Sequence, residues 1–85
     1  MFKEDESNMI AEFQKNSRER IIVKFSEYKG SKLLDIRVHY DSSQGEKPVW
    51  SPSLKGISVP VALLPQLKEA IEKAYEMWRS MAEFV

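Results

Sequence analysis

The 85-residue chain has no cysteine and a single histidine, which excludes a disulfide framework, a thiolate metal site and a multi-histidine metal site within one chain. Its longest apolar run, residues 59–64, contains Pro60 and is far too short to cross a bilayer. The N-terminus lacks the basic and apolar segments of a secretory signal. No Ser-His-Asp set, phosphate loop or zinc spacing is apparent, so we expect no enzyme, cofactor or metal.

The formal net charge is zero, but the charges are unevenly distributed. Residues 1–14 sum to −3, residues 15–55 to +4 and residues 56–85 to −1. A local positive field can steer a polyanion even when the net charge is zero, so the central segment is the candidate for nucleic-acid contact. Without a membrane segment or a signal, we expect no membrane partner. We expect a cytoplasmic, nucleoid-associated protein in a bacterium, or a nuclear one in a eukaryote.

Residues 20–40 predict a β-hairpin. Two β-branched and aromatic segments, residues 20–28 and 32–40, flank Gly30, where a tight turn needs positive φ. Side chains alternate along a strand, so the hairpin has an apolar side, expected to meet a helix, and a basic side with a tyrosine at each end, expected to meet a ligand. The apolar side holds Ile21, Val23, Phe25, Leu34, Ile36 and Val38, and the basic side holds Arg20, Lys24, Ser26, Tyr28, Asp35, Arg37 and His39, with Tyr40 expected at its far end.

The whole chain is short enough to be one domain, which we expect over residues 9–85 after a disordered acidic tail at residues 1–8. The expected fold class is α+β, with a four-stranded antiparallel sheet followed by one long amphipathic helix. The remaining strands are short. They are an edge strand at residues 9–13, favoured over a helical turn, and a last strand at 55–59 that follows a polar loop at 41–48 and a break at 51–53.

From residue 61 to residue 84 the apolar period becomes helical, and Pro65 requires the helix to start within residues 61–64. Such a helix is about 33 Å long, whereas four strands cover less than about 20 Å. The distal apolar side chains would therefore be exposed unless a second copy covers them, which we expect across a two-fold axis. The alternative is that the segment around Ile10 and Phe13 folds back over them. The expected interface residues are Ile71, Tyr75, Trp78 and Met81.

Five short pieces occur in a fixed order: Tyr28-Lys29-Gly30, Leu33-Leu34-Asp35-Ile36-Arg37, the aromatic Tyr40, Lys55-Gly56-Ile57-Ser58 and the helical Gln66-Leu67-Lys68. In this order and spacing they resemble the positive cofactor four family of transcriptional coactivators, over residues 10–78. The short build is similar to the bacterial and phage members. The resemblance implies a curved four-stranded sheet backed by one helix, a homodimer formed through the helices, and binding of single-stranded DNA or melted duplex on the sheet.

The resemblance also implies roles for individual residues. Tyr28 stands at a base-stacking aromatic, Arg37 at a strand arginine, and Tyr40 at an aromatic that is usually tryptophan. The chain departs from the family in its acidic tail and in a longer loop that contains Trp50, which is either a core anchor or an added stacking platform. The expected nucleic-acid-binding residues are Lys24, Tyr28, Lys29, Lys32, Arg37, Tyr40, Lys47, Trp50 and Lys55.

Each of these residues also has a structural interpretation. The tyrosines could cap the core, Arg37 could pair with Asp35 on its own strand, and the lysines could simply keep a sheet face hydrated. The expected function is single-stranded DNA binding with little sequence specificity, by a transcriptional coactivator at opened duplex. RNA and the transcription machinery are further candidate partners. The alternative is a dimeric protein-interaction module of the same fold that binds no nucleic acid.

Overall fold

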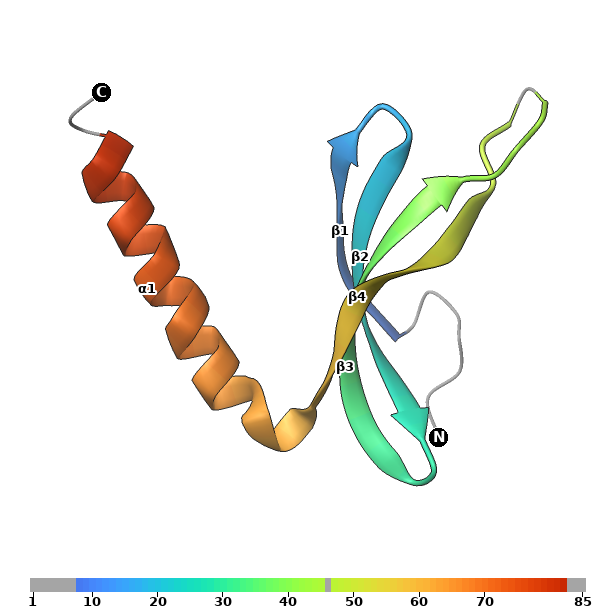
Figure 1. Ribbon diagram of the computed structural model, residues 1–85. Coiled ribbons are helices and arrows are strands. Elements are labelled where there is room, and N and C mark those ends of the chain that lie inside the picture. Colours follow the sequence, from blue (N-terminus) through green and yellow to red (C-terminus); the bar gives the residue numbers. More distant parts are fainter. Residues whose placement is uncertain (1–7, 46, 83–85) are drawn as a thin grey trace.

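The computed structural model describes residues 8–45 and 47–82. Four strands form one antiparallel sheet in the order β1-β2-β3-β4, and one helix follows (Figure 1). The predicted α+β class and the ββββα order are therefore confirmed. Most of the predicted tail lies outside the described residues, but Asn8 is described and is buried. The elements are β1 (Met9–Asn16), β2 (Glu19–Tyr28), β3 (Ser31–Asp41), β4 (Trp50–Pro60), the 3-10 turn η2 (Val61–Leu63) and α1 (Leu64–Ala82).

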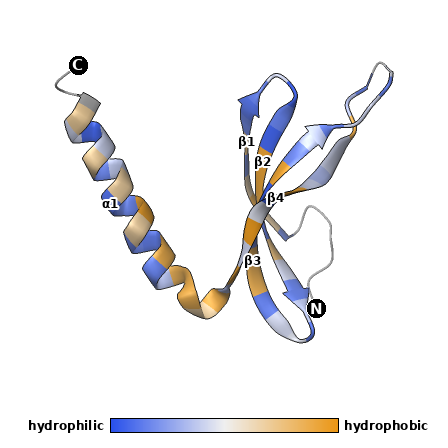
Figure 2. Cartoon of the chain, in the orientation of Figure 1, coloured by the Kyte–Doolittle hydropathy of each residue, from blue (hydrophilic) through white to orange (hydrophobic). Residues whose placement is uncertain are grey.

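The central hairpin forms as the sequence predicts. The pair Tyr28 and Ser31 closes a two-residue turn in which Lys29 has φ 50° and Gly30 has φ 81°. Positive φ at both central residues matches the twist of the flanking strands, and Gly30 adopts it without steric cost. Lys29 adopts the same conformation at a cost, because its Cβ crowds the backbone. The hydropathy colouring in Figure 2 shows polar hairpin ends and apolar strand centres.

The last strand is longer than predicted. We expected a break at residues 51–53 and a strand only over 55–59, but β4 begins at Trp50 and runs to Pro60. A proline is tolerated here because β4 lies at the edge of the sheet. The pairing of β4 with β3 is interrupted by a register shift, which lies between Arg37 and His39 of β3. At the opposite edge, β1 confirms the strand that was favoured for residues 9–13 and extends it to Asn16.

Gly56 allows β3 and β4 to approach each other closely. It pairs with Arg37, and a Cβ atom at Gly56 would lie 2.5 Å from the carbonyl oxygen of Ile36 and 2.9 Å from the Cα of Arg37. No side chain fits at these distances. The glycine of the Lys55-Gly56-Ile57-Ser58 piece is therefore required by packing between the two strands, on the side of β4 next to the register shift.

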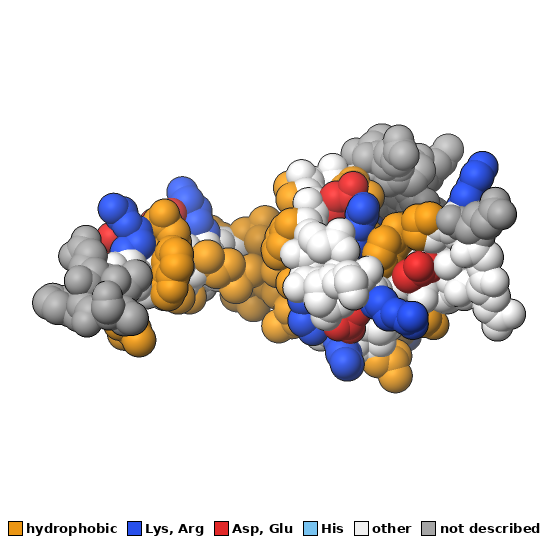
Figure 3. All heavy atoms as spheres, turned by 90° about the horizontal axis from the view of Figure 1, so that it is seen from above, with side chains coloured by type: hydrophobic (Ala, Val, Ile, Leu, Met, Phe, Trp, Pro, Cys, Tyr) orange, Lys and Arg blue, Asp and Glu red, His pale blue; other side chains and the backbone are white. Residues whose placement is uncertain are grey.

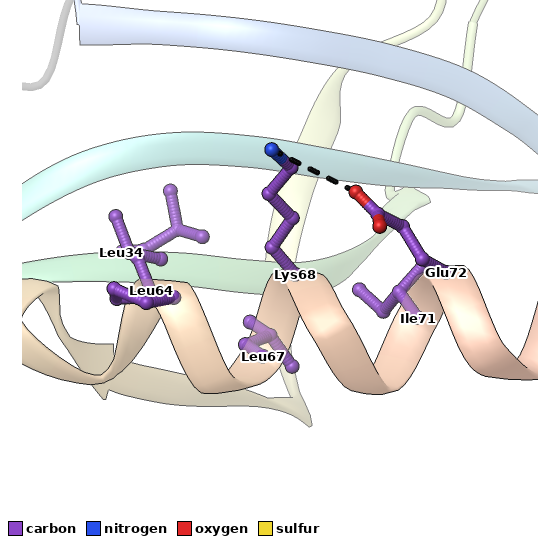
Figure 4. A pocket seen from close by; sticks show the side chains of 7 residues that line it. Leu34, Leu64, Leu67, Lys68, Ile71 and Glu72 are labelled. Atoms are coloured by element: carbon purple, nitrogen blue, oxygen red, sulfur yellow. Dashed lines mark ion pairs between the residues drawn. The ribbon is translucent and has the colours of Figure 1, made fainter.

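The helix leaves the sheet as an arm rather than lying across it (Figure 1). Its start contacts the sheet in an apolar groove, where Leu34 of β3 faces Leu64, Leu67 and Ile71 of α1 (Figure 4). Seen from above, the helix and the sheet form two lobes with hydrophobic side chains at their junction (Figure 3). Within the single chain, the apolar side of the hairpin therefore meets the helix only in this groove.

The core of the single chain is correspondingly small. Its buried hydrophobic residues, among those described, are Ile22, Leu34 and Val59. The Cα radius of gyration is 15.5 Å, against about 12 Å for a compact chain of this length. The chain by itself therefore leaves much apolar surface in water. Within the described residues, no helix is both long enough and apolar enough to span a membrane.

Part of the uncovered apolar surface is on α1. Trp78 is 61% exposed, and its ring contacts that of Tyr75 with 5.9 Å between centroids. In the alternative prediction, the N-terminal segment covers the exposed apolar side chains of α1, called here the helical stripe. This alternative is wrong, because β1 lies at the far edge of the sheet from β4, the strand that leads into the helix. Ile10 and Phe13 are themselves exposed. The predicted interface residues, Ile71, Tyr75, Trp78 and Met81, all stay exposed in the single chain.

Candidate nucleic-acid interface

One hollow on the sheet collects three of the predicted binding residues. The hairpin register aligns Lys24 with Asp35, and alternation places Tyr28 and Arg37 on the same face. These side chains line one hollow, called here the face hollow, together with Asp35 and the neighbouring polar residues Ser26 and Ser58. Tyr28 is 64% exposed as a residue, and the Lys29 ammonium lies 5.3 Å from the centroid of its ring. The face hollow therefore combines an accessible aromatic residue with two basic groups, Lys24 and Arg37, and two carboxylates, Asp35 and Glu27.

Asp35 and Arg37 form the polar centre of the face hollow. The Asp35 side chain accepts hydrogen bonds from Arg37 Nη2 at 2.9 Å, from Arg37 Nε at 3.1 Å and from Ser58 Oγ at 2.9 Å. Arg37 Nη1 also donates to the carbonyl oxygen of Ser53 at 3.0 Å. The network links β3 to β4 on both sides of Gly56, so it positions the arginine and the edge strand together.

The pKa values of this pair reflect their mutual stabilisation. Burial raises the pKa of Asp35, but the hydrogen bonds from Arg37 and Ser58 outweigh it, so the net pKa is lowered. The hydrogen bond to Asp35 raises the pKa of Arg37. Both groups therefore stay charged at neutral pH. The structural interpretation of Arg37, a pair with Asp35 on its own strand, is confirmed.

Arg37 still has hydrogens to offer a ligand. Its guanidinium carries five N–H donors, and the bonds to Asp35 and Ser53 leave one hydrogen on each terminal nitrogen. The side chain keeps 22% of its surface exposed. Because the guanidinium is already fixed, a phosphate contact would cost little further conformational entropy.

Tyr40 lies on the other side of the sheet from Tyr28. It pairs with Glu19 and has the same parity as Val38 and Ile36, on the apolar side of β3. The expectation of a tyrosine at each end of the basic side is therefore wrong for Tyr40. Instead, Tyr40 lines a second hollow at the register shift of β4, called here the bulge hollow, together with Arg37, Pro52, Ser53, Leu54 and Lys55.

Trp50 lies at the start of β4 and pairs with Asp41, which gives it the parity of Arg37. The Arg20 guanidinium lies 4.7 Å from the centroid of its ring and is also 3.4 Å from the Glu12 carboxylate. Trp50 is half-buried, and the stacked arginine occupies part of its ring surface. The tryptophan therefore anchors the loop end against β2, on the same face as Tyr28.

The remaining predicted lysines are dispersed. Lys47 is exposed in the loop before β4, and Asp41 holds that loop by accepting bonds from the backbone N–H groups of Ser43 at 2.9 Å and Val49 at 3.1 Å. Lys32 pairs with Glu27 across the hairpin, on the face opposite to Lys24. Among the described residues, no group of three or more His, Asp or Glu side chains is placed to hold a metal ion.

Comparison with known proteins identifies the chain. The sequence profile of the transcriptional coactivator p15 (PC4) family matches residues 15–70. The chain belongs to the PC4 family. The predicted resemblance is therefore confirmed, and membership associates the chain with nucleic-acid binding and transcription, in a family that is not enzymatic.

Solved structures of a bacterial PC4 homolog have the same fold. The tetragonal crystal form of BPSL1147, a PC4 homolog from Burkholderia pseudomallei, has 28% sequence identity, covers 79% of this chain and 94% of its own, and gives a TM-score of 0.68. The orthorhombic form has 27% identity, covers 86% of this chain and 96% of its own, and gives a TM-score of 0.69. Among curated proteins, none matches the chain significantly.

Sequence reasoning missed two parts of this PC4 surface. Ser58 was seen only as part of a family motif, yet it helps to hold Asp35 in place. Leu54 was not singled out, although it lines the bulge hollow beside Tyr40 and Lys55. The serine and proline residues at 51–53 were the available signal, since turn-forming residues within a strand often mark a bulge.

Proposed function

We propose that this PC4-family protein binds single-stranded DNA with little sequence preference, in the role of a transcriptional coactivator at opened duplex. The observation that carries the proposal is the face hollow, where the exposed Tyr28 ring lies on the same face as Lys24 and Arg37. Family membership and the similarity to a bacterial PC4 homolog support it.

The chemistry of the face hollow suits an unpaired strand. Bases stack on aromatic rings whatever their identity, with about 1–3 kcal/mol per stacked base, while basic groups follow the phosphates. In this proposal a base stacks on Tyr28, and Lys24 and the two remaining Arg37 hydrogens contact phosphates. A paired duplex hides its base faces, so it could use only the phosphate contacts and binds more weakly.

The functional unit in this proposal is a homodimer. The exposed side chains of Ile71, Tyr75, Trp78 and Met81 lie on one helix that its own sheet contacts only near its start. An isologous contact across a two-fold axis would bury this stripe on both copies at once. It would also bring two face hollows into one assembly, so that one strand could bind both by increased effective concentration.

The test is a fluorescence-anisotropy titration of labelled oligothymidine of about 20 nucleotides, longer than one typical single-strand site, with a matched duplex at two salt concentrations. We expect tighter, salt-dependent binding to the single strand. The lysine variants Lys24→Ala and Lys55→Ala should each flatten the salt dependence by about 0.7 in the logarithmic slope. Tyr28→Ala should weaken binding without changing that slope.

The control is Lys73→Ala, which removes the same charge from α1, where Lys73 pairs with Glu69 at 3.5 Å. Arg37→Ala is a poor first test, because it would leave the buried Asp35 carboxylate without its main partner. Absence of binding to either oligonucleotide at low salt would refute the proposal. The protein-interaction module of the same fold would then be the better explanation.

A further inference from the structure

Leu54 is 98% exposed, although it is a large aliphatic residue in the middle of β4. A single exposed leucine is not unusual in itself. Leu54 is unusual because it lies at the register shift between β3 and β4, where the strand departs from regular pairing. Bulges of this kind re-aim a side chain, and they are frequent beside functional sites.

The backbone that presents Leu54 is held firmly by Ser53. The Ser53 hydroxyl donates a hydrogen bond to the carbonyl oxygen of Val38 at 2.8 Å and accepts one from the backbone N–H of Lys55 at 3.1 Å. The Ser53 carbonyl oxygen accepts the hydrogen bond from Arg37. Three hydrogen bonds therefore fix Ser53, the residue before Leu54. A ligand that contacts the Leu54 side chain would therefore lose little conformational entropy in ordering the backbone.

The neighbours of Leu54 have the chemistry of a nucleotide site. The bulge hollow is lined by Leu54 together with Tyr40, Lys55 and Arg37. An aromatic ring and an aliphatic side chain can contact a base, and a cation beside them can contact its phosphate. Leu54 contributes almost nothing to the core of the chain, so its apolar surface is available to a ligand.

We propose that Leu54 is a base-contacting residue, and that an unpaired base of single-stranded DNA packs against Leu54 and Tyr40 in the bulge hollow with its phosphate at Lys55. The inference rests on the proposed single-strand binding and extends the binding surface beyond the face hollow. Arg37 lines both hollows, so it connects them.

A second copy of the chain is a less suitable occupant. The exposed helical stripe begins after Leu64, whereas Leu54 lies six residues before Pro60, about 20 Å away along an extended strand. Two basic residues beside Leu54 favour an anionic ligand over the same hollow of a two-fold-related copy, which would bring like charges together.

The test compares Leu54→Ser and Leu54→Met on two labelled oligonucleotides of about 20 positions, long enough for one single-strand site. One is oligothymidine and the other is abasic, with the same phosphates and no bases. Leu54→Ser should weaken binding to oligothymidine about five- to tenfold and leave abasic binding unchanged, while Leu54→Met should bind both as the wild type does. Val49→Ser, at another exposed aliphatic residue of the preceding loop, is the control and should change neither.

Three results with the Leu54→Ser variant, and one with the wild type, would overturn the inference. Equal loss on both oligonucleotides would mean that Leu54 affects only backbone contacts, and unchanged binding to both would remove it from the site. A lower sedimentation mass for Leu54→Ser would assign the residue to an interface between copies. If the wild type binds neither oligonucleotide, single-strand binding itself fails, and this outcome is recognised without any variant.

Discussion

The Asp35 carboxylate accepts hydrogen bonds from Nε and Nη2 of Arg37, two residues further along the same strand, at 3.1 and 2.9 Å. Asp35 is only 7% exposed to solvent, so the arginine neutralises a carboxylate charge that is largely shielded from water. The same guanidinium fastens β4 through Ser53. Arg37 is therefore a structural residue as well as a candidate for phosphate contact, and lysine could not replace it because lysine lacks the planar fork.

Acid should destabilise the protein through Asp35. Its pKa is lower in the folded chain than in the unfolded chain, so its contribution is fully present above the unfolded value near pH 4 and is lost as pH falls through the lower folded value. Glu19 and Asp41 act in the same direction, since hydrogen bonds from Asn16 and Ser43 respectively lower their pKa values. Thermal midpoints measured from pH 7 to pH 2.5 should fall less steeply for Asp35→Asn than for the wild type. Parallel curves would contradict the assignment.

Gly56→Ala should destabilise the fold by about 2–3 kcal/mol, because the new methyl group would overlap the carbonyl of Ile36 and force β3 and β4 apart. Urea unfolding measures the change. The matched control is Gly45→Ala, since a Cβ atom at Gly45 meets nothing within 4 Å. A Gly56→Ala protein as stable as the Gly45→Ala protein would show that the strands can separate without cost.

Lys29→Asn should stabilise the protein by about 0.5–1 kcal/mol, because asparagine tolerates the left-handed conformation that Lys29 adopts at φ 50°. Gly30→Ala should act in the opposite direction, because Gly30 has φ 81°. The urea midpoint of each variant measures these changes. Equal midpoints for the two variants would mean that the turn does not limit stability.

Trp78→Glu should convert the proposed dimer to a monomer at micromolar concentration, because a charge would be placed in the centre of the exposed helical stripe. Sedimentation equilibrium measures the mass. Lys73→Gln, also on α1 but paired with Glu69, should remain dimeric. A wild type that sediments as a monomer, or a Trp78→Glu protein that stays dimeric, would contradict the helical interface.

Much of the fold could be predicted because local rules and tertiary packing agree. Alternation and the glycine turn defined the β2–β3 hairpin, and helical periodicity with Pro65 located the start of α1. The extent of β4 could not be predicted, because Pro52 and Ser53 signal a break locally. Pro52 and Ser53 can remain within β4 because Ser53 hydrogen-bonds to β3 and because β4 is an edge strand, and neither fact is visible in the sequence.

The candidate site was less predictable than the fold. Parity in the sequence places Tyr28, Lys24 and Arg37 on one face, and the structure agrees. The same rule places Tyr40 on the other face, although a tyrosine was expected at each end of the basic side. The exposure of Leu54 and the network around Asp35 depend on contacts between strands more than ten residues apart, which no local pattern contains.

The order β1-β2-β3-β4 gives the sheet a low contact order, because every strand pairs with the strand next to it in the chain. Two of the three connections are tight turns, and closing a short loop costs little entropy. The sheet can therefore be assembled from hairpins of neighbouring strands, without a long-range crossover. For a sheet protein of this size, folding should be fast.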